Sequence, residues 1–109
     1  MKKLFLIAIV TLMQLGASEP RIVEIQAKRF QFTPNVVHLK KGETVTIRLT
    51  STDTAHGLLV DELNVDLDTA PDRPDSVTIT PAQTGTFHAI CDHFCGGGHG
   101  GMQMTIVVE

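Results

Sequence analysis

The stretch KGETVTIRLTS, residues 41–51, alternates apolar and polar side chains with a period of two. In an extended chain Val45, Ile47 and Leu49 fall on one face, and the polar residues Thr44, Thr46, Arg48 and Thr50 fall on the other. The Lys-Gly pair at the start of the stretch supplies a turn. The segment therefore predicts a β-strand with one face in a core and the other in water.

Similar short runs recur along the chain. They occupy residues 22–32, 36–40, 57–60, 76–80, 86–91 and 104–109, with turn signals at Pro34, at 71–74 and at 81–85. Residues 61–75 carry five Asp, one Glu and two Pro, which predicts a long surface connection with one short strand. About seven short strands separated by turns predict an all-β sandwich.

The first 18 residues have the layout of a secretory signal peptide. Lys2 and Lys3 precede the apolar run LFLIAIVTLM, and small residues close the segment. The run is shorter than the roughly 20 apolar residues that cross a bilayer, although an uncleaved segment would still anchor the chain. We expect a signal peptide at 1–18, one domain at 19–109, and a periplasmic or other extracytoplasmic location.

The charge balance argues against nucleic acid as a partner. The chain of 109 residues has 9 Lys+Arg and 12 Asp+Glu, and removal of two leader lysines leaves 7 against 12, a formal −5. Nucleic-acid binding calls for a basic surface, whereas this balance favours a basic protein partner. The length allows one domain and one core.

The segment CDHFCGGGHGGM, residues 91–102, concentrates soft metal ligands between two predicted strands. It brings together the thiols of Cys91 and Cys95, the imidazole of His99 and the thioether of Met102. Thiolate and thioether select soft metals such as Cu(I), and imidazole suits both copper oxidation states. The segment predicts copper, and its glycines predict a chain that turns tightly around the ion.

Two other interpretations of this segment stay open. Zinc accepts two Cys and two His, and the spacing of Cys91 and Cys95 suits a structural zinc site, but Met102 then has no role. In an exported protein the two cysteines also suit a disulfide that closes a β-sandwich acting as an interaction module. That interpretation leaves His56, His99 and Met102 without a function.

The other histidines differ in their surroundings. His56 ends the polar loop STDTA and precedes an apolar strand, which by itself indicates an exposed loop histidine. His38 and His88 fall inside strand patterns, and we expect both on the surface of a sheet.

Together, the pattern SxDxxHG at 51–57 and the pattern Cys-x3-Cys-x3-His-x2-Met at 91–102 resemble the dinuclear copper (CuA) domain of cytochrome c oxidase subunit II. Nitrous oxide reductase carries the same domain. The likeness extends through FQFTP, KKGETVTIRL, TGTFHAIC and MTIVVE, and covers nearly everything after residue 20. It implies a cupredoxin-like Greek-key β-sandwich.

The resemblance also implies a set of ligands for two copper ions. They are two bridging thiolates from Cys91 and Cys95, two terminal imidazoles from His56 and His99, the thioether of Met102, and the backbone carbonyl of His93.

By this resemblance the protein carries single electrons and has no substrate chemistry of its own, unless it forms the electron-input part of an oxidase. The implied partners are a donor such as a c-type cytochrome and an oxidase or reductase acceptor, with the membrane reached only through the N-terminal segment. One alternative is a mononuclear blue-copper carrier that uses His56, Cys95, His99 and Met102. Another is a periplasmic protein that stores copper or delivers it for oxidase assembly.

Three features depart from the family pattern. Many family members have a magnesium-binding Glu where His93 stands. The chain has no Trp and no Tyr, so Phe30 and Phe32 occupy the place of the family's aromatic patch, or else belong to the core. The family's membrane-spanning helices are absent or reduced to the leader, which indicates a freestanding relative.

Overall fold

The computed structural model describes residues 19–109. The expected signal peptide at 1–18 lies outside the described residues. Among the residues that are described, no helix is long and apolar enough to cross a membrane.

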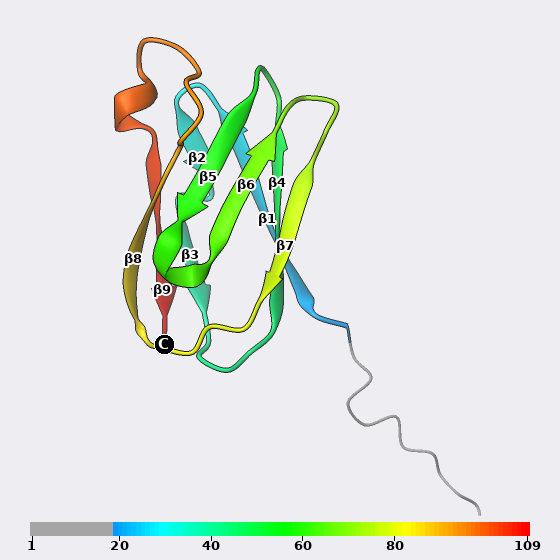
Figure 1. Cartoon of the computed structure of the whole chain (residues 1–109), viewed down its shortest axis with the longest axis vertical. Coiled ribbons are helices and arrows are strands. Elements are labelled where there is room, and N and C mark those ends of the chain that lie inside the picture. The colour runs from blue at the N-terminus through cyan, green and yellow to red at the C-terminus, as the bar shows by residue number, and fades with distance from the viewer. Residues whose placement is uncertain (1–18) are drawn as a thin grey trace, which may run out of the picture.

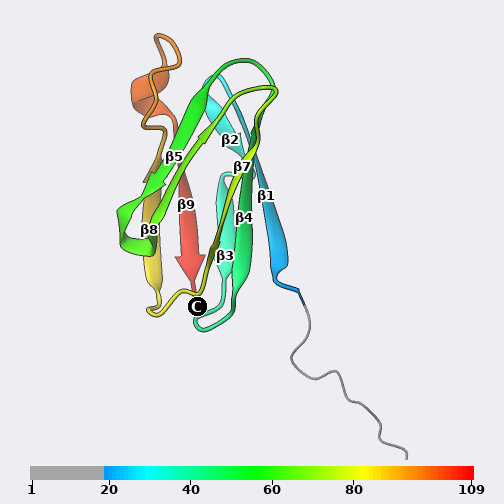
Figure 2. The same ribbon diagram turned by 45° about the vertical axis from the view of Figure 1, so that its right-hand side comes forward.

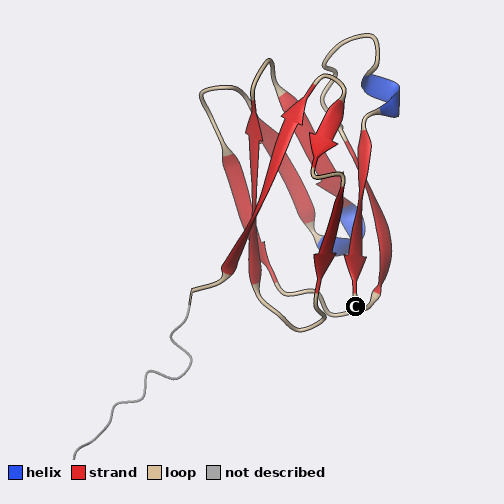
Figure 3. Ribbon diagram, turned by 180° about the vertical axis from the view of Figure 1, so that it is seen from behind, coloured by secondary structure: helices blue, strands red, loops and turns tan. Residues whose placement is uncertain are grey.

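The described chain consists of strands in two sheets, with two single-turn 3-10 helices (Figures 1 and 3). The strands are β1 (Arg21–Lys28), β2 (Gln31–Thr33), β3 (Val36–Leu39), β4 (Val45–Ser51), β5 (His56–Val60), β6 (Val65–Thr69), β7 (Asp75–Ile79), β8 (Gly85–Ile90) and β9 (Gln103–Val108). The helical turns are η1 (Asp61–Leu63) and η2 (His99–Gly101). One sheet has the order β2-β1-β4-β7, and the other has the order β3-β9-β8-β5-β6.

The predicted all-β sandwich is confirmed, with nine strands in place of about seven. The run at 22–32 divides into β1 and β2, which pair antiparallel with Gln26 opposite Thr33. The chain reverses direction at Arg29 and Phe30. Neither is a typical turn-forming residue, so the sequence predicted a single strand through this point. The strand expected within 61–75 is β6, and η1 precedes it.

Alternation in β4 determines where the core lies. Val45, Ile47 and Leu49 are all fully buried. In the parallel pairing of β1 with β4, Val23 lies opposite Ile47 and Ile25 opposite Leu49. The apolar residues of β1 and β4 therefore share the inner face of their sheet and pack against the second sheet.

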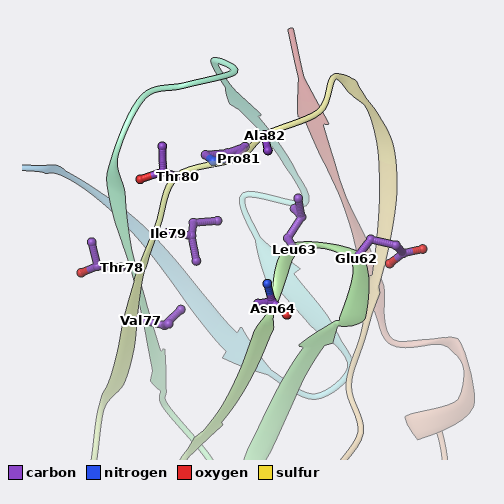
Figure 4. Close-up of a pocket in the computed structure, with 9 residues that line it drawn as sticks. All are labelled: Glu62, Leu63, Asn64, Val77, Thr78, Ile79, Thr80, Pro81 and Ala82. Carbon is purple, nitrogen blue, oxygen red and sulfur yellow. The ribbon is translucent and has the colours of Figure 1, made fainter.

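The connections between strands place the candidate ligands at one end of the sandwich. The turn from β1 to β2 and the loops from β4 to β5 and from β8 to β9 lie at the end opposite the C-terminus (Figures 1 and 2). A pocket between η1 and β7 is lined by Glu62–Asn64 and Val77–Ala82, and contains none of the candidate ligands (Figure 4).

Candidate metal centre

The loop between β4 and β5 orients the imidazole of His56. The Asp53 amide donates to the Ser51 hydroxyl at 3.3 Å, and the same hydroxyl donates to the Thr54 carbonyl. One carboxylate oxygen of Asp53, Oδ1, accepts hydrogen bonds from the Thr54 amide at 2.7 Å and from His56 Nε2 at 2.8 Å. His56 is fully buried, so its ring orientation is fixed by this contact.

The ionisation of Asp53 determines which His56 nitrogen is available to a metal. Burial opposes the charged carboxylate, but hydrogen bonds from Arg29, His56 and Thr54 outweigh burial and lower the pKa of Asp53 to about 2. An ionised carboxylate only accepts hydrogen bonds, so Nε2 of His56 carries the proton. Nδ1 is the ring nitrogen that faces the cysteines, and it lies 3.9 Å from Cys91 Sγ.

The loop between β8 and β9 brings the remaining candidate ligands together. Its base is closed by a hydrogen bond from the Cys91 amide to the Met102 carbonyl at 3.1 Å. The two sulfurs, Cys91 Sγ and Cys95 Sγ, lie 4.0 Å apart. Cys95 Sγ is 3.7 Å from His99 Nδ1 and 3.8 Å from Met102 Sδ. The His93 carbonyl lies 3.3 Å from Cys91 Sγ.

All six candidate groups predicted from the sequence therefore lie in one cluster. His56, Cys91 and Cys95 offer ligand atoms within 4.8 Å of one another, and all three side chains are buried. The side chain of His93 is directed elsewhere, with Nδ1 at 3.0 Å from the Phe94 carbonyl. His93 thus faces the cluster with its backbone carbonyl and not with its imidazole.

The donor set fits a soft metal ion. Both cysteines are free thiols, and burial together with the neighbouring Cys91 raises the pKa of Cys95 to about 11. Without a cation the Cys95 thiol stays protonated at neutral pH, whereas a bound soft ion would stabilise it as a thiolate. The sulfurs, imidazole nitrogens and thioether suit copper, and no calcium or magnesium site is built from such donors.

Gly57, next to His56, allows close packing with the cysteine loop. A Cβ at this position would overlap the carboxylate of Asp92, which lies over β5. The pKa of Asp92 is raised by burial and by the nearby Asp66 carboxylate. The Gly of the SxDxxHG pattern therefore has a steric reason to be there.

The glycines of the cysteine loop only partly fit the expected role of turning around an ion. A Cβ at Gly98 would lie 2.6 Å from the Phe30 ring, and one at Gly96, where φ is +141°, would lie 3.0 Å from it. Gly97, Gly100 and Gly101 have nothing within 4 Å of a built Cβ. Two of the five glycines thus serve contact with Phe30, a residue distant in the sequence.

We predict that Gly98→Ala destabilises the reduced apo protein by about 1–3 kcal/mol, because the methyl group overpacks against the Phe30 ring. Gly97→Ala is the matched control, with the same change in open space one residue away, and is expected within about 0.5 kcal/mol of wild type. Urea unfolding of both variants measures the difference. Equal stabilities would contradict the packing argument.

The exposure of the side chains decides the remaining predictions about phenylalanine and histidine residues. Phe32 is buried in the core, while Phe30 is 39% exposed beside the cysteine loop. His38 in β3 and His88 in β8 are exposed, as predicted, and His38 contacts Glu109 at 3.0 Å. Neither histidine belongs to the cluster.

Sequence patterns did not indicate the importance of Arg29. Its amide donates to Asp53 Oδ2 at 2.7 Å, and its side-chain Nε donates to the Cys95 carbonyl at 2.7 Å. The second contact joins residues 66 positions apart, so no local motif contains it. Asp53 itself is part of SxDxxHG. Its position three residues before His56 was the sequence signal that could have indicated a hydrogen bond between the two side chains.

Comparison with known proteins gives consistent similarities. A family profile described as "Cupredoxin-like domain" matches residues 3–108. The chain is 32% identical over 87 residues to two cytochrome c oxidase subunit 2 sequences from Thermus thermophilus, covering 80% of this chain. It spans 64% of the length of one and 52% of the other. The periplasmic domain of subunit II of cytochrome oxidase from Bradyrhizobium japonicum has a similar fold, with a TM-score of 0.75, 18% identity, and coverage of 82% of this chain and 83% of that one.

Proposed function

The chain belongs to the cupredoxin-like family, and from that premise we propose that it is a copper-binding electron-transfer protein with a dinuclear centre of the CuA type. The proposed ligands are the side chains of His56, Cys91, Cys95, His99 and Met102 and the backbone carbonyl of His93. The chain would carry single electrons without substrate chemistry of its own.

One observation carries the proposal for two metal ions. Each buried sulfur has its own imidazole neighbour, with His56 Nδ1 at 3.9 Å from Cys91 and His99 Nδ1 at 3.7 Å from Cys95. A mononuclear blue-copper site needs only one thiolate, and Cys91 would then lie buried beside His56 and Cys95 with no role. Two thiolates with a histidine at each side suit two ions that share the sulfurs.

The residues around the cluster favour rapid electron transfer. Copper, when bound, supplies the one-electron redox change. The ligands come from the first residue of β5 and from the loop between β8 and β9, and the Asp53 contact holds His56 in one orientation. Little rearrangement would therefore accompany a change of charge. Burial of His56, Cys91, Cys95 and Met102 keeps water away from the sulfurs.

The cluster approaches the surface through His99. This residue is half-buried, and the Phe94 ring lies 5.6 Å from its ring, centroid to centroid. Phe94 is 72% exposed. We propose that redox partners dock here, with a donor such as a c-type cytochrome and an oxidase or reductase as acceptor. Residues 1–18 are the proposed signal for export to the periplasm.

The test is metal content and electron paramagnetic resonance on protein reconstituted with copper. Two coppers per chain that share one unpaired electron are expected. His88→Ala is the matched control, since it removes an exposed imidazole outside the cluster and should leave both readouts unchanged. One copper per chain with the spectrum of a single ion would favour the mononuclear carrier. Copper that passes quickly to a chelator would favour storage or delivery.

A further inference from the structure

The turn between β1 and β2 contacts both ligand loops at once. The Arg29 amide donates to Asp53, which in turn accepts from His56 on the first loop. The Arg29 side chain donates from Nε to the carbonyl of Cys95 on the second loop. A single residue outside the ligand set therefore links the proposed ligands His56 and Cys95 through hydrogen bonds.

The neighbouring Phe30 reinforces this link by packing. Its ring fills the space left by the missing side chains of Gly96 and Gly98. Arg29 Nε also lies 3.4 Å from where a Cβ on Gly96 would stand. The turn thus holds the segment from Cys95 to Gly98 by one hydrogen bond and by one aromatic contact.

The guanidinium also contributes charge close to the sulfurs. Arg29 Nε lies 2.7 Å from the carbonyl oxygen of Cys95, so the positive charge of the guanidinium stands next to a residue whose sulfur is a proposed ligand. The hydrogen bond from Arg29 to Cys95 is part-buried, where charges are screened less than in bulk water. A fixed positive charge stabilises whichever redox state carries the more negative charge.

We propose that Arg29 is a positioning residue that clamps the two ligand loops together and, through its charge, raises the reduction potential of the metal centre. The proposal rests on the function proposed above. One-electron reduction by the donor forms and breaks no bond in the protein, and lowers the net charge of the centre by one. The reduced state therefore gains more from Arg29 than the oxidised state does.

The experiment compares the midpoint potentials of copper-loaded wild type, Arg29→Gln and Arg29→Lys. Arg29→Gln is expected to reduce the equilibrium constant for reduction about tenfold, equivalent to a potential lower by about 59 mV for one electron. Arg29→Lys keeps the charge and is expected to stay close to wild type. Lys28→Gln is the matched control, because it removes one exposed positive charge from the adjacent position.

A second readout tests the clamp without copper. Amide hydrogen exchange at Gly96 and Gly98 in the reduced apo protein is expected to be faster in Arg29→Gln than in Lys28→Gln, because the loop loses its hydrogen bond. A failure of Arg29→Gln to bind two coppers, with binding retained in Arg29→Lys, would support the same proposal. If neither Arg29→Gln nor Arg29→Lys bound two coppers, the proposed role of the Arg29 charge would be overturned.

An unchanged potential and unchanged exchange in Arg29→Gln would overturn the proposal outright. If wild-type protein took up no copper, the proposed function would fail instead. The exchange rates of the apo variants would then still decide whether Arg29 clamps the loops.

Discussion

Cys91→Ser is expected to abolish the shared-electron signal and to reduce bound copper from two ions per chain to one or fewer. The Cys91 sulfur is 4.0 Å from Cys95 Sγ and 3.9 Å from His56 Nδ1, so it is close enough to both to serve as a shared ligand. A serine hydroxyl is a hard donor that does not replace a bridging thiolate for copper. Copper analysis and electron paramagnetic resonance measure both losses.

Cys95→Ser provides the discriminating comparison. In a dinuclear centre both substitutions remove a shared ligand, so both abolish the signal. In a mononuclear site built from Cys95, His99, Met102 and His56, Cys91→Ser leaves a copper spectrum and Cys95→Ser destroys it. A spectrum that survives Cys91→Ser unchanged would therefore contradict the dinuclear proposal. Far-ultraviolet circular dichroism of each reduced apo variant serves as the folding control.

The sandwich could be predicted because strands with one buried face alternate apolar and polar residues in the sequence. Val45, Ile47 and Leu49 alternate with polar residues, and all three are fully buried as that pattern requires. The pattern does not mark a chain reversal that uses ordinary residues. The turn at Arg29 and Phe30 was missed for this reason, and one expected run became two strands.

The candidate site was predictable where its chemistry is local. Cys91, Cys95, His99 and Met102 lie within one loop, so the concentration of soft donors was visible directly. His56 is 35 positions from Cys91, and only the resemblance of two separate patterns joined them.

Supporting contacts were beyond the reach of local patterns. Arg29 reaches Cys95 across 66 positions, and a charged residue at the end of a strand pattern carries no sign of such a partner. Gly96 and Gly98 were visible as glycines, but the reason for them is the Phe30 ring. What a small residue makes room for depends on the tertiary fold, because the neighbour belongs to another part of the chain.

Air-oxidised apo protein is expected to take up no copper until a reductant is added. The two free thiols lie 4.0 Å apart, and a small movement of the loop brings them to the roughly 2.05 Å of a disulfide. Bond formation transfers two electrons and two protons to an oxidant such as dioxygen, and removes both thiolates as ligands. Because the pKa of Cys95 is raised to about 11, little of this thiol is thiolate at neutral pH, and attack by its sulfur on an oxidant should be slow.

The measurement is thiol titration followed by copper analysis, before and after treatment with dithiothreitol. Oxidised protein should show no free thiols and no bound copper, and reduced protein should recover two of each. Cys91→Ser is the control, since with Cys95 alone it forms no intramolecular disulfide and its residual copper binding should not depend on a disulfide reductant. If oxidised wild-type protein without free thiols bound two coppers per chain, the predicted need for a reductant would be refuted. Such a result would also remove the thiolates from the centre, because imidazoles and a thioether would then suffice to hold the metal.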